Sequence, residues 1–334
     1  MKELVSMICP EHRQDMARIA AEIAEYACPQ GCRYPILRGI PRFVEASSYV
    51  DSFGLQWKTF RKTQLDSYTG VSLSQIRLAR IAGGNLDVFR GKLILEAGCG
   101  AGRFTEVMLG AGGRVVATDL SSAVDANFAN CSHLGEYFVC QADIWKLPFN
   151  PGSFDVVVCV GVIQHTPDPE VTINTLCMFL KPNGILLIDH YPPEYPATLS
   201  RRMLRWGFLK VSPKCALSVC SGLVKGLWPI HKLIWRFVNL PGVRVIPGIR
   251  KIRSAFLWLS PVVDYQSAYP ELGGELLRVW ALLDTHDTLT DRFKHFRSAE
   301  QINSCLSQAG MVDITTQLGG NGVETRARRP TATG

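Results

Sequence analysis

The sequence predicts an α/β protein built on a parallel, doubly wound sheet. Strand-like and helix-like segments alternate from Leu93 to His190, and repeated units of this kind form parallel sheets. The apolar segment 154–161 contains VVVCVG, which is typical of a strand that is buried on both faces. A glycine-rich loop follows the first strand, in LEAGCGAGRF (95–104). Such a loop predicts a nucleotide-containing ligand at the end of that strand.

The individual elements are expected in a regular order. The strands are 92–96, 114–118, 136–141, 154–161 and 184–190, and the helices between them are 104–111, 124–131 and 169–180. A further helix is expected at 272–283. The capping box that starts at Ser298 opens another helix, which ends at Gln308, and two last strands are expected at 312–317 and 322–328.

Composition limits the class of protein. The 334 residues exceed one minimal domain, and an apolar fraction of 47% is sufficient for a sizeable core. The N-terminus lacks the pattern of a signal peptide, and no apolar stretch has the length of a membrane span. Most of the 11 cysteines lie singly inside apolar runs, as in reduced intracellular proteins. We therefore expect a cytoplasmic protein.

Positive charge is concentrated in one segment. The chain has a formal net charge of +7, with 36 Lys and Arg against 29 Asp and Glu. Residues 195–263 contain twelve of the basic residues and no Asp or Glu, so the rest of the chain is slightly acidic. A local excess of this kind predicts a local anionic partner.

The N-terminal segment 1–45 is expected to form a small zinc-ribbon-like unit. Four donors with the spacing C-x2-H-x15-C-x3-C would close a tetrahedral structural zinc site. A helix is expected at 16–27 and a hairpin at 34–43. Bound Zn²⁺ would stabilise a unit that is too small for a core of its own. The alternative is that these are ordinary cysteines beside proline turns. The predicted ligands are Cys9, His12, Cys28 and Cys32.

The glycine loop differs from two common nucleotide-binding loops. A dinucleotide fingerprint would place a glycine where Arg103 stands, and no Lys-Ser or Lys-Thr follows as in a P-loop. Instead, Asp119 in ATDLS can accept both ribose hydroxyls, and Asp143 in QADIWKLPF can meet an adenine amino group. Glu96 can order the loop or meet a cofactor ammonium group. The alternative for either aspartate is that it caps its own loop.

These motifs resemble those of class I S-adenosylmethionine-dependent methyltransferases, and most closely the small-molecule group that includes ubiquinone biosynthesis. LEAGCGAGRF, ATDLS, QADIWKLPF, GVIQHTPDP and LKPNGILLI occur in the family's order over roughly residues 90–190. The resemblance implies a Rossmann-like seven-stranded sheet of order 3-2-1-4-5-7-6, with the seventh strand antiparallel. It implies methylation as the reaction and S-adenosyl-L-methionine as the cofactor. The cofactor-binding residues that we expect are Glu96, Gly98, Gly100, Gly102, Asp119, Leu120, Asp143, Ile144 and Gly161.

Transfer of a methyl group to oxygen also requires a base. His165 and His190 follow strands at the edge where ligands of open α/β sheets bind. Asp284 and His286 are further catalytic candidates. Each has a structural alternative, because such residues also shape loops or cap helices. The loop after the fourth strand lacks the Asn/Asp-Pro-Pro-Tyr/Phe pattern of methyltransferases that act on amino nitrogen, which argues against such an enzyme.

The segment after the fifth strand is expected to form a helical substrate lid, as it commonly does in the family. Amphipathic helices are expected near 199–205 and 230–237, and four tryptophans alternate with the basic residues of 195–263. Three interpretations stay open: an anionic membrane surface as partner, RNA as partner, or a lid whose charges are merely solvated. The predicted domains are a zinc-ribbon-like unit (1–45), a helical cover (46–90), a methyltransferase core (91–191 and 298–328) and a basic lid (192–297).

The function expected from the sequence is that of an S-adenosylmethionine-dependent methyltransferase. Its acceptor is expected to be an oxygen of a small, or lipid- or glycan-linked, metabolite. The first alternative is an RNA base methyltransferase, because the N-terminal unit resembles the zinc ribbon of rRNA guanine methyltransferases. The second is a methyltransferase-like binding protein without activity, against which the intact glycine loop and Asp119 argue. The expected location is the cytoplasm, with peripheral attachment to the inner face of a membrane as a variant of it.

Overall fold

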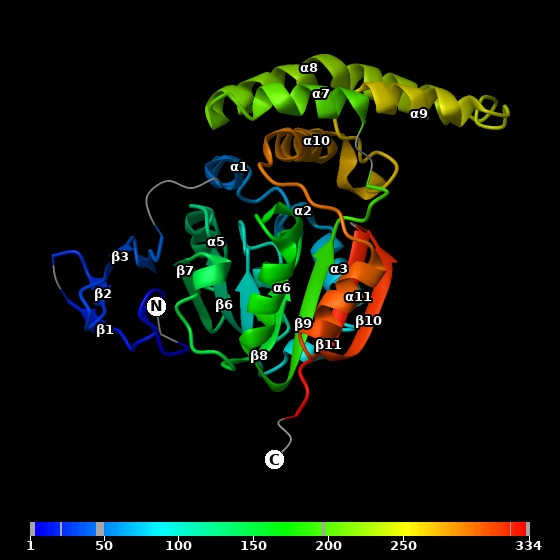
Figure 1. Ribbon diagram of the computed structural model, residues 1–334. Helices are drawn as coiled ribbons and strands as arrows, with labels where there is room; N and C mark the ends of the chain where they lie inside the picture. The colour runs from blue at the N-terminus through cyan, green and yellow to red at the C-terminus, as the bar shows by residue number, and fades with distance from the viewer. Residues whose placement is uncertain (1–3, 21, 45–49, 196–197, 321, 332–334) are drawn as a thin grey trace. The chain divides into compact units, whose positions relative to one another are not determined.

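The computed structural model describes residues 4–20, 22–44, 50–195, 198–320 and 322–331 (Figure 1). The chain divides into two compact units. The first unit consists of Met1–Arg61, Ser72–Tyr195 and Phe293–Gly334, and the second of Lys62–Val71 and Pro196–Arg292. The second unit therefore includes most of the segment predicted as a lid, together with ten residues from the segment predicted as a helical cover.

The first unit is built around a seven-stranded sheet of order β10-β11-β9-β8-β5-β6-β7. Read from β7 and numbered along the chain, this order is 3-2-1-4-5-7-6, so the predicted class I methyltransferase fold is confirmed. β11 is antiparallel to β9 and β10, and the other pairs are parallel. The strands are β5 (Leu93–Ala97), β6 (Arg114–Asp119), β7 (Tyr137–Gln141), β8 (Phe154–Cys159), β9 (Leu180–His190), β10 (Val312–Gly319) and β11 (Gly322–Arg328).

Helices cover both faces of this sheet, which explains why its parallel strands are mostly apolar (Figure 1). Successive side chains of a strand point to opposite faces. Leu95 belongs to one hydrophobic core with residues of α6 and α11, whereas Ile94 belongs to a second core with residues of α3, α4 and α5. The covering helices are α3 (Leu73–Ile81), α4 (Thr105–Gly110), α5 (Val124–Cys131), α6 (Pro169–Met178) and α11 (Ala299–Gln308).

A small antiparallel sheet precedes this core, with the strand order β1-β2-β3-β4. The predicted helix over 16–27 is wrong, because two paired strands form there, with Ala17 opposite Ala27. Every side chain of β1 is exposed, whereas Tyr26 of β2 is buried in the hydrophobic core. The hairpin predicted at 34–43 is present. The four strands are β1 (Ala17–Ile19), β2 (Glu25–Ala27), β3 (Arg33–Leu37) and β4 (Ile40–Pro41).

The end of this small sheet joins the edge of the large one. The Phe43 N–H donates to the Gln141 carbonyl of β7 at 2.8 Å, and the Arg42 guanidinium donates to the Gln141 side chain at 3.0 Å. Arg42 also pairs with Asp125 of α5 at 2.6 Å. The N-terminal sheet is therefore fastened to the methyltransferase core at β7.

The second unit is helical. It contains α2 (Asp66–Thr69), α7 (Leu199–Phe208), α8 (Pro213–Val238), α9 (Ile249–Leu259) and α10 (Gly273–Thr290). α10 packs against α7 and α8. It continues to Thr290, seven residues beyond the predicted end of this helix. Where the sequence indicated a short amphipathic segment near 230–237, α8 is one continuous helix of 26 residues. Among the described helices, none is long and apolar enough to cross a membrane.

Candidate functional site

The glycine loop lies at the carboxyl end of β5 and adopts a conformation that favours glycine. Gly98, Gly100 and Gly102 have φ values of 81°, 49° and 101°. A Cβ on Gly98 would lie 2.3 Å from the Val162 side chain, and one on Gly102 would lie 2.5 Å from the Cys131 sulfur. The three glycines therefore allow a sharp, closely packed turn at this edge of the sheet.

Asp119, at the end of β6, holds this loop in place. Its Oδ2 accepts a hydrogen bond from the Gly100 N–H at 2.9 Å, and its Oδ1 accepts from the Ser121 N–H and hydroxyl at 2.8 and 2.7 Å. Burial raises the pKa of Asp119, although these donors act in the opposite direction. Asp119 therefore caps these loops, which was the structural alternative given for it. Its role in binding a ribose stays a prediction.

Glu96 is buried below the loop and links β5 to α4. Its Oε2 accepts a hydrogen bond from the Thr105 hydroxyl, which in turn accepts one from the Asn127 amide at 2.9 Å. Burial raises the pKa of Glu96 to about 8. Of the two roles predicted for this residue, ordering of the loop is the one that these contacts support.

Asp143, at the end of β7, begins the short 3₁₀-helix η2 (Ile144–Lys146). Its Oδ1 accepts from the Trp145 N–H at 2.9 Å, and Ile144 is buried. The Gln141 amide donates to the Leu120 carbonyl at 2.9 Å and so joins the loops that follow β6 and β7. Because β5, β6 and β7 are parallel neighbours, their three loops lie side by side, as predicted.

Helix α1 (Asp51–Thr59) lies within the segment predicted as a helical cover, and it packs on the glycine loop, a contact that the sequence did not predict. A Cβ on Gly100 would lie 3.3 Å from the Trp57 ring, and one on Gly54 would lie 2.6 Å from the Ser122 hydroxyl. The helix therefore packs directly on the loops after β5 and β6. The glycine at position 54, inside a helix, is the signal in the sequence that could have indicated this close approach.

A buried ion pair that the sequence analysis also missed lies where β8 and β9 end. Asp189 accepts a hydrogen bond from the Gly161 N–H at 2.6 Å, and its other oxygen pairs with Arg77. The Gly161 amide is thus engaged by the protein itself. The feature of the sequence that could have indicated this ion pair is the aspartate at the end of the otherwise apolar stretch ILLID (185–189).

His165 and His190 both lie in the first unit, beyond β8 and in β9. The His165 Nδ1 donates to the Phe293 carbonyl at 3.2 Å, and its ring meets Tyr191 edge-on at 5.5 Å. The His190 Nδ1 donates to the Tyr191 carbonyl at 2.9 Å. Burial lowers the pKa of His190 to about 4, so this side chain is neutral at neutral pH. Its catalytic role, like that of His165, stays a prediction.

Three buried polar atoms near these strand ends lack a hydrogen-bond partner among the described residues: His190 Nε2, His295 Nε2 and Gln164 Oε1. The His295 N–H donates to the Gln164 carbonyl at 2.9 Å, which joins two of the segments. His295 also contributes to the lowered pKa of His190. Because buried polar groups normally have partners, unsatisfied atoms beside a loop of this kind indicate a polar ligand or water.

The other two catalytic candidates, Asp284 and His286, lie in α10 of the second unit. His286 is fully buried, and burial lowers its pKa to about 4 while a hydrogen bond with the Pro213 backbone at the start of α8 acts in the opposite direction. His286 is buried by packing within the second unit itself. No described contact indicates a catalytic role for either residue.

Three of the four predicted metal ligands, Cys9, His12 and Cys32, form a cluster whose ligand atoms all lie within 4.8 Å of one another, and the fourth, Cys28, contacts His12. The sulfurs of Cys9, Cys28 and Cys32 lie 3.7, 3.5 and 3.5 Å from His12 Nδ1. Zinc bond lengths of about 2.3 Å to sulfur and 2.0 Å to nitrogen separate two tetrahedral ligands by roughly 3.5 Å. Although burial acts against it, hydrogen bonds with Tyr34 and the nearby backbone lower the pKa of Cys9 to about 6, which favours the thiolate. These donors therefore fit a zinc ion.

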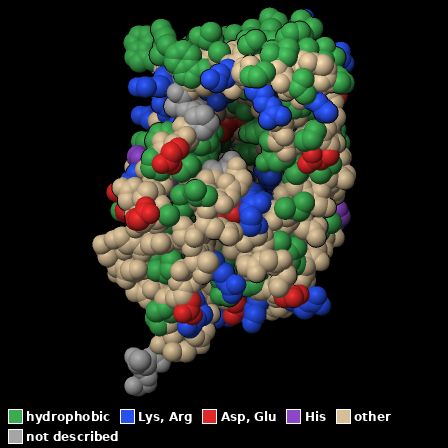
Figure 2. All heavy atoms as spheres, turned by 90° about the vertical axis from the view of Figure 1, so that its right-hand side faces the viewer, with side chains coloured by type: hydrophobic (Ala, Val, Ile, Leu, Met, Phe, Trp, Pro, Cys, Tyr) green, Lys and Arg blue, Asp and Glu red, His purple; other side chains and the backbone are tan. Residues whose placement is uncertain are grey.

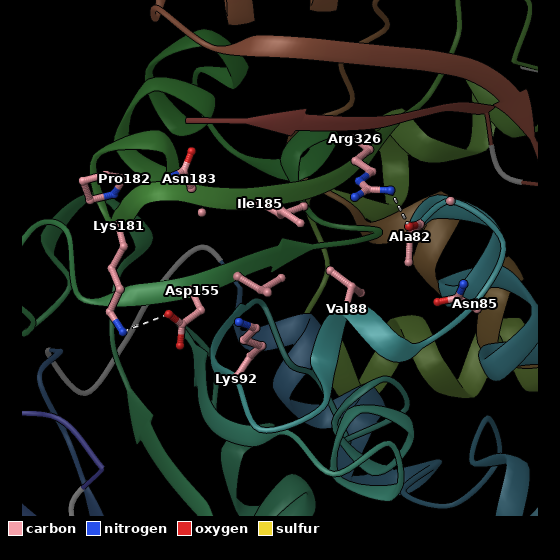
Figure 3. A pocket seen from close by; sticks show the side chains of 13 residues that line it. Ala82, Asn85, Val88, Lys92, Asp155, Lys181, Pro182, Asn183, Ile185 and Arg326 are labelled. Carbon is pink, nitrogen blue, oxygen red and sulfur yellow. Dashed lines mark hydrogen bonds and ion pairs between the residues drawn. The ribbon is translucent and has the colours of Figure 1, made fainter. Parts of the chain in front are cut away.

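A cavity of about 440 Å³ lies at the opposite edge of the large sheet, around the amino ends of β5, β8 and β9 (Figure 3). Lys181 pairs with Asp155 there at 2.9 Å, and Arg326 donates to the Ala82 carbonyl at 3.0 Å. Ligands of open α/β sheets bind at the carboxyl ends of the strands. This cavity is therefore distinct from the predicted cofactor site.

Comparison with known proteins identifies the central region. Residues 95–188 match the family described as Methyltransferase domain. The chain is 31% identical over 113 residues to the ubiquinone biosynthesis O-methyltransferase of Coxiella burnetii, a match that covers 33% of this chain and 48% of that protein. It is 27% identical over 197 residues to the enzyme of the same name from Pasteurella multocida, covering 55% and 76%. The chain thus spans about half the length of the first of these relatives.

Among solved structures, magnesium protoporphyrin IX methyltransferase from Synechocystis PCC 6803, with bound SAH, aligns with a TM-score of 0.42. The identity is 16%, and the alignment covers 84% of this chain and 96% of that chain. The sheet order, the glycine loop and the family match define the class of protein. The central part of this chain is a methyltransferase domain with the class I, S-adenosylmethionine-dependent fold, and the N-terminal Cys and His cluster is compatible with the predicted zinc-ribbon-like segment.

Proposed function

We propose that this protein transfers a methyl group from S-adenosylmethionine to an oxygen of a small, or lipid- or glycan-linked, acceptor. The observation that carries the proposal is the meeting of the glycine loop, Asp119 and Asp143 at one edge of the sheet. The relatives named as ubiquinone biosynthesis O-methyltransferases support oxygen as the atom that receives the methyl group.

The cofactor would supply an electrophilic methyl group on a sulfonium ion. The chain's own residues would bind and orient it. Asp119 would accept hydrogen bonds from the ribose, Asp143 would face the adenine amino group, and the glycine loop would allow the close approach of backbone that the methionine portion needs. Trp57, which packs on Gly100, would help to exclude water from this edge.

His190 would orient the acceptor hydroxyl and take its proton on Nε2 as the oxygen attacks the methyl group. Because its Nδ1 proton is committed to the Tyr191 carbonyl, its Nε2 carries the lone pair and can accept a hydrogen bond. With a pKa lowered to about 4 by burial, it stays in this neutral form over the physiological range. The Phe293 carbonyl holds His165 in the same tautomer, which makes His165 the second candidate for this role.

Aromatic side chains beyond β9 support an acceptor with a flat or apolar part. Tyr191 and Tyr195 stack with their ring centres 4.0 Å apart, and His165 lies between Tyr191 and Phe53, with ring centres at 5.5 and 5.6 Å. Apolar and aromatic walls with a few polar groups are typical of small-molecule sites. This wall and the unsatisfied Nε2 of His190 would recognise an amphiphilic hydroxyl compound.

We also propose that the N-terminal sheet holds one structural zinc ion, bound by Cys9, His12, Cys28 and Cys32. All four positions would be filled by protein, so the ion would stabilise the sheet and take no part in catalysis. Elemental analysis should find about one zinc per chain. Cys28→Ser should lose this metal, whereas Cys177→Ser, at a buried cysteine of α6, should keep it. Equal zinc content in both variants would contradict the assignment.

The function is tested by methyl transfer from labelled S-adenosylmethionine to separated lipid, glycan, small-molecule and RNA fractions of a cell extract. We expect label in a lipid, glycan or small-molecule fraction, in a product from which mild base does not release the label, as for an ether. Label that appears only in RNA and disappears on ribonuclease treatment would contradict the proposed acceptor. Failure of the chain to bind the cofactor would contradict the proposed activity as a whole.

A further inference from the structure

The second unit exposes an unusually apolar surface on α7, α8 and α9. Six large apolar side chains there are each more than half exposed. Figure 2 shows hydrophobic side chains gathered at the top of the view, where these helices lie, with Lys and Arg side chains bordering them. A large, contiguous apolar surface on a folded protein usually marks an interaction site. We call this surface the outer apolar face; its members that are more than half exposed are Met203, Trp206, Leu233, Ile252, Trp258 and Leu259.

The arrangement of α8 explains how this face arises. Val219, Ile230, Leu233 and Phe237 recur at helical spacing along one side and are exposed. The residues that α8 buries, such as Ala216, Cys220 and Val224, follow a different side. The helix therefore has two apolar sides, of which only one packs against the protein. A helix that served only as a lid with solvated charges would need only the apolar side that packs against the protein.

A buried polar network keeps this helix in its orientation. His231 of α8 is buried, with its Nδ1 2.9 Å from Asp264 and its Nε2 2.8 Å from the Ser260 hydroxyl. Arg253 of α9 pairs with the same aspartate at 3.3 Å. The polar side chain of His231 is thus buried, while the apolar side chain of Leu233, two residues further along α8, is exposed. The exposure of the outer apolar face is a consequence of a specific packing arrangement.

Basic residues flank the outer apolar face. Along α8, Lys214, Lys225, Lys232 and Arg236 lie about 60–100° from the position of Leu233, all on the same side of the exposed apolar stripe. Two residues beyond the end of α7, the Lys210 ammonium lies 3.4 Å from the centre of the Trp206 ring. No acidic residue occurs from 195 to 263. Helices α7, α8 and α9 therefore combine exposed apolar side chains with basic side chains and carry no acidic one, although Lys232 also interacts with Glu275 of α10.

We propose that the outer apolar face and its basic border dock on an anionic lipid membrane, with the helices lying in the interface. Amphipathic helices with Trp and Leu on one side and Lys or Arg beside them bind such surfaces. The absence of a membrane-spanning helix in the described chain agrees with attachment rather than insertion across the bilayer. The inference goes beyond the proposed methyl transfer and does not rest on it.

The chemistry of the face favours lipid over the two other occupants. RNA would attract the basic residues, but it offers no apolar surface that would cover Met203, Leu233 and Leu259. A second copy of the chain would cover them, but a two-fold contact would bring two borders of the same positive charge together. A membrane with anionic lipids would bury the apolar side chains and attract the basic ones.

Flotation of the full chain with lipid vesicles tests the proposal. The chain should float with vesicles of phosphatidylcholine containing about one third phosphatidylglycerol, more weakly with phosphatidylcholine alone, and less as salt is raised. Trp206→Ser with Leu233→Ser should reduce binding at least about tenfold. Lys225→Gln with Arg236→Gln should reduce binding to the anionic vesicles about fivefold per residue and so weaken the preference for anionic lipid.

Matched variants in the first unit serve as controls. Ile76→Ser with Leu318→Ser removes two similarly exposed apolar side chains, and Arg90→Gln with Lys92→Gln removes two exposed charges. Both should bind vesicles like the unaltered chain, and thermal unfolding should confirm that every variant is folded. Equal binding by all variants, or no binding to anionic vesicles, would overturn the proposal. So would a salt-sensitive RNA complex without vesicle binding, or a dimer that the Trp206 and Leu233 changes dissociate.

Discussion

The two units of the molecule differ in which side chains they bury and which they expose. In the first unit, the apolar strands are covered on both faces, and polar side chains such as Asp119 and Asp143 collect at the carboxyl edge of the sheet. In the second unit, the polar network around His231 is inside, while Leu233 and Trp206 face outward. The first arrangement supports the proposed small-molecule site, and the second supports the proposed attachment to a lipid surface.

This difference separates two tasks within one chain. The first unit has the features that would bind a cofactor and orient a hydroxyl group. The second has the features that would bring the protein to a lipid surface. If both proposals hold, an acceptor that resides in or near a membrane would reach the enzyme without leaving that surface. The variants below each change a residue of only one of the two units.

The largest effect is expected from His190, which belongs to the chemistry of the first unit. His190→Ala should reduce the rate of methyl transfer by about 10²–10⁴-fold, because the acceptor hydroxyl loses its hydrogen-bond partner. Binding of S-adenosylmethionine should remain, as calorimetry would show. His165→Ala is the matched variant. A greater loss of activity with His165→Ala than with His190→Ala would assign the role to the other histidine.

The second effect concerns the internal polar network of the second unit. Asp264→Ala should destabilise this unit by about 3–5 kcal/mol, because it leaves Arg253 and His231 without their buried partner. Urea unfolding and limited proteolysis within 196–292 would measure the change. Asp264→Asn, which keeps an acceptor oxygen, should cost less. Equal stability of all three proteins would mean that this network does not hold α8 in place.

A pH-dependent effect is expected from Glu96 of the first unit. Burial raises its pKa from 4.5 to about 8, so the folded protein holds this proton more tightly than the unfolded chain does. The contribution to stability is complete below about pH 4.5 and is lost as the pH rises toward 8. Glu96→Gln should therefore flatten the dependence of the unfolding free energy on pH between 5 and 8. An unchanged slope in that variant would show that another group titrates.

The smallest effect is expected from Trp57, which covers the glycine loop. Trp57→Ala should weaken binding of S-adenosylmethionine by roughly tenfold or less, because the loop keeps its support from Asp119 while its apolar cover is lost. Trp145→Ala, at the neighbouring loop after β7, provides a comparison. If Trp57→Ala binds the cofactor more tightly, then α1 obstructs the site instead of covering it.

Much of the first unit could be predicted because its signals are local. Strand and helix patterns, the glycine loop and the aspartates after β6 and β7 follow one another along the chain, and parallel strands bring their ends together. The Cys and His residues of the proposed zinc site were identified from their spacing in the sequence. The strand order came from the family resemblance, because no local pattern specifies which strands become neighbours.

What could not be predicted depends on distant contacts. Arg77 meets Asp189 across 112 positions of sequence, and α1 reaches the glycine loop only through the packing of Gly54 and Trp57. The segment 16–27 has residues that suit a helix, but its pairing as strands is a tertiary effect. In the second unit, the pattern predicted amphipathic helices, whereas only the structure distinguishes the apolar side that is buried from the one that is exposed.

The most direct test of the account is calorimetric titration of S-adenosylmethionine into the full chain and into two aspartate variants. Asp119→Ala removes the carboxylate at the carboxyl edge of the sheet, and Asp155→Ala removes one at the opposite edge, beside the cavity of Figure 3. The account predicts binding by the unaltered chain and by Asp155→Ala, with at least about a hundredfold loss in Asp119→Ala. Unchanged affinity in Asp119→Ala, or no binding by the unaltered chain, would contradict the assignment of this edge as the cofactor site.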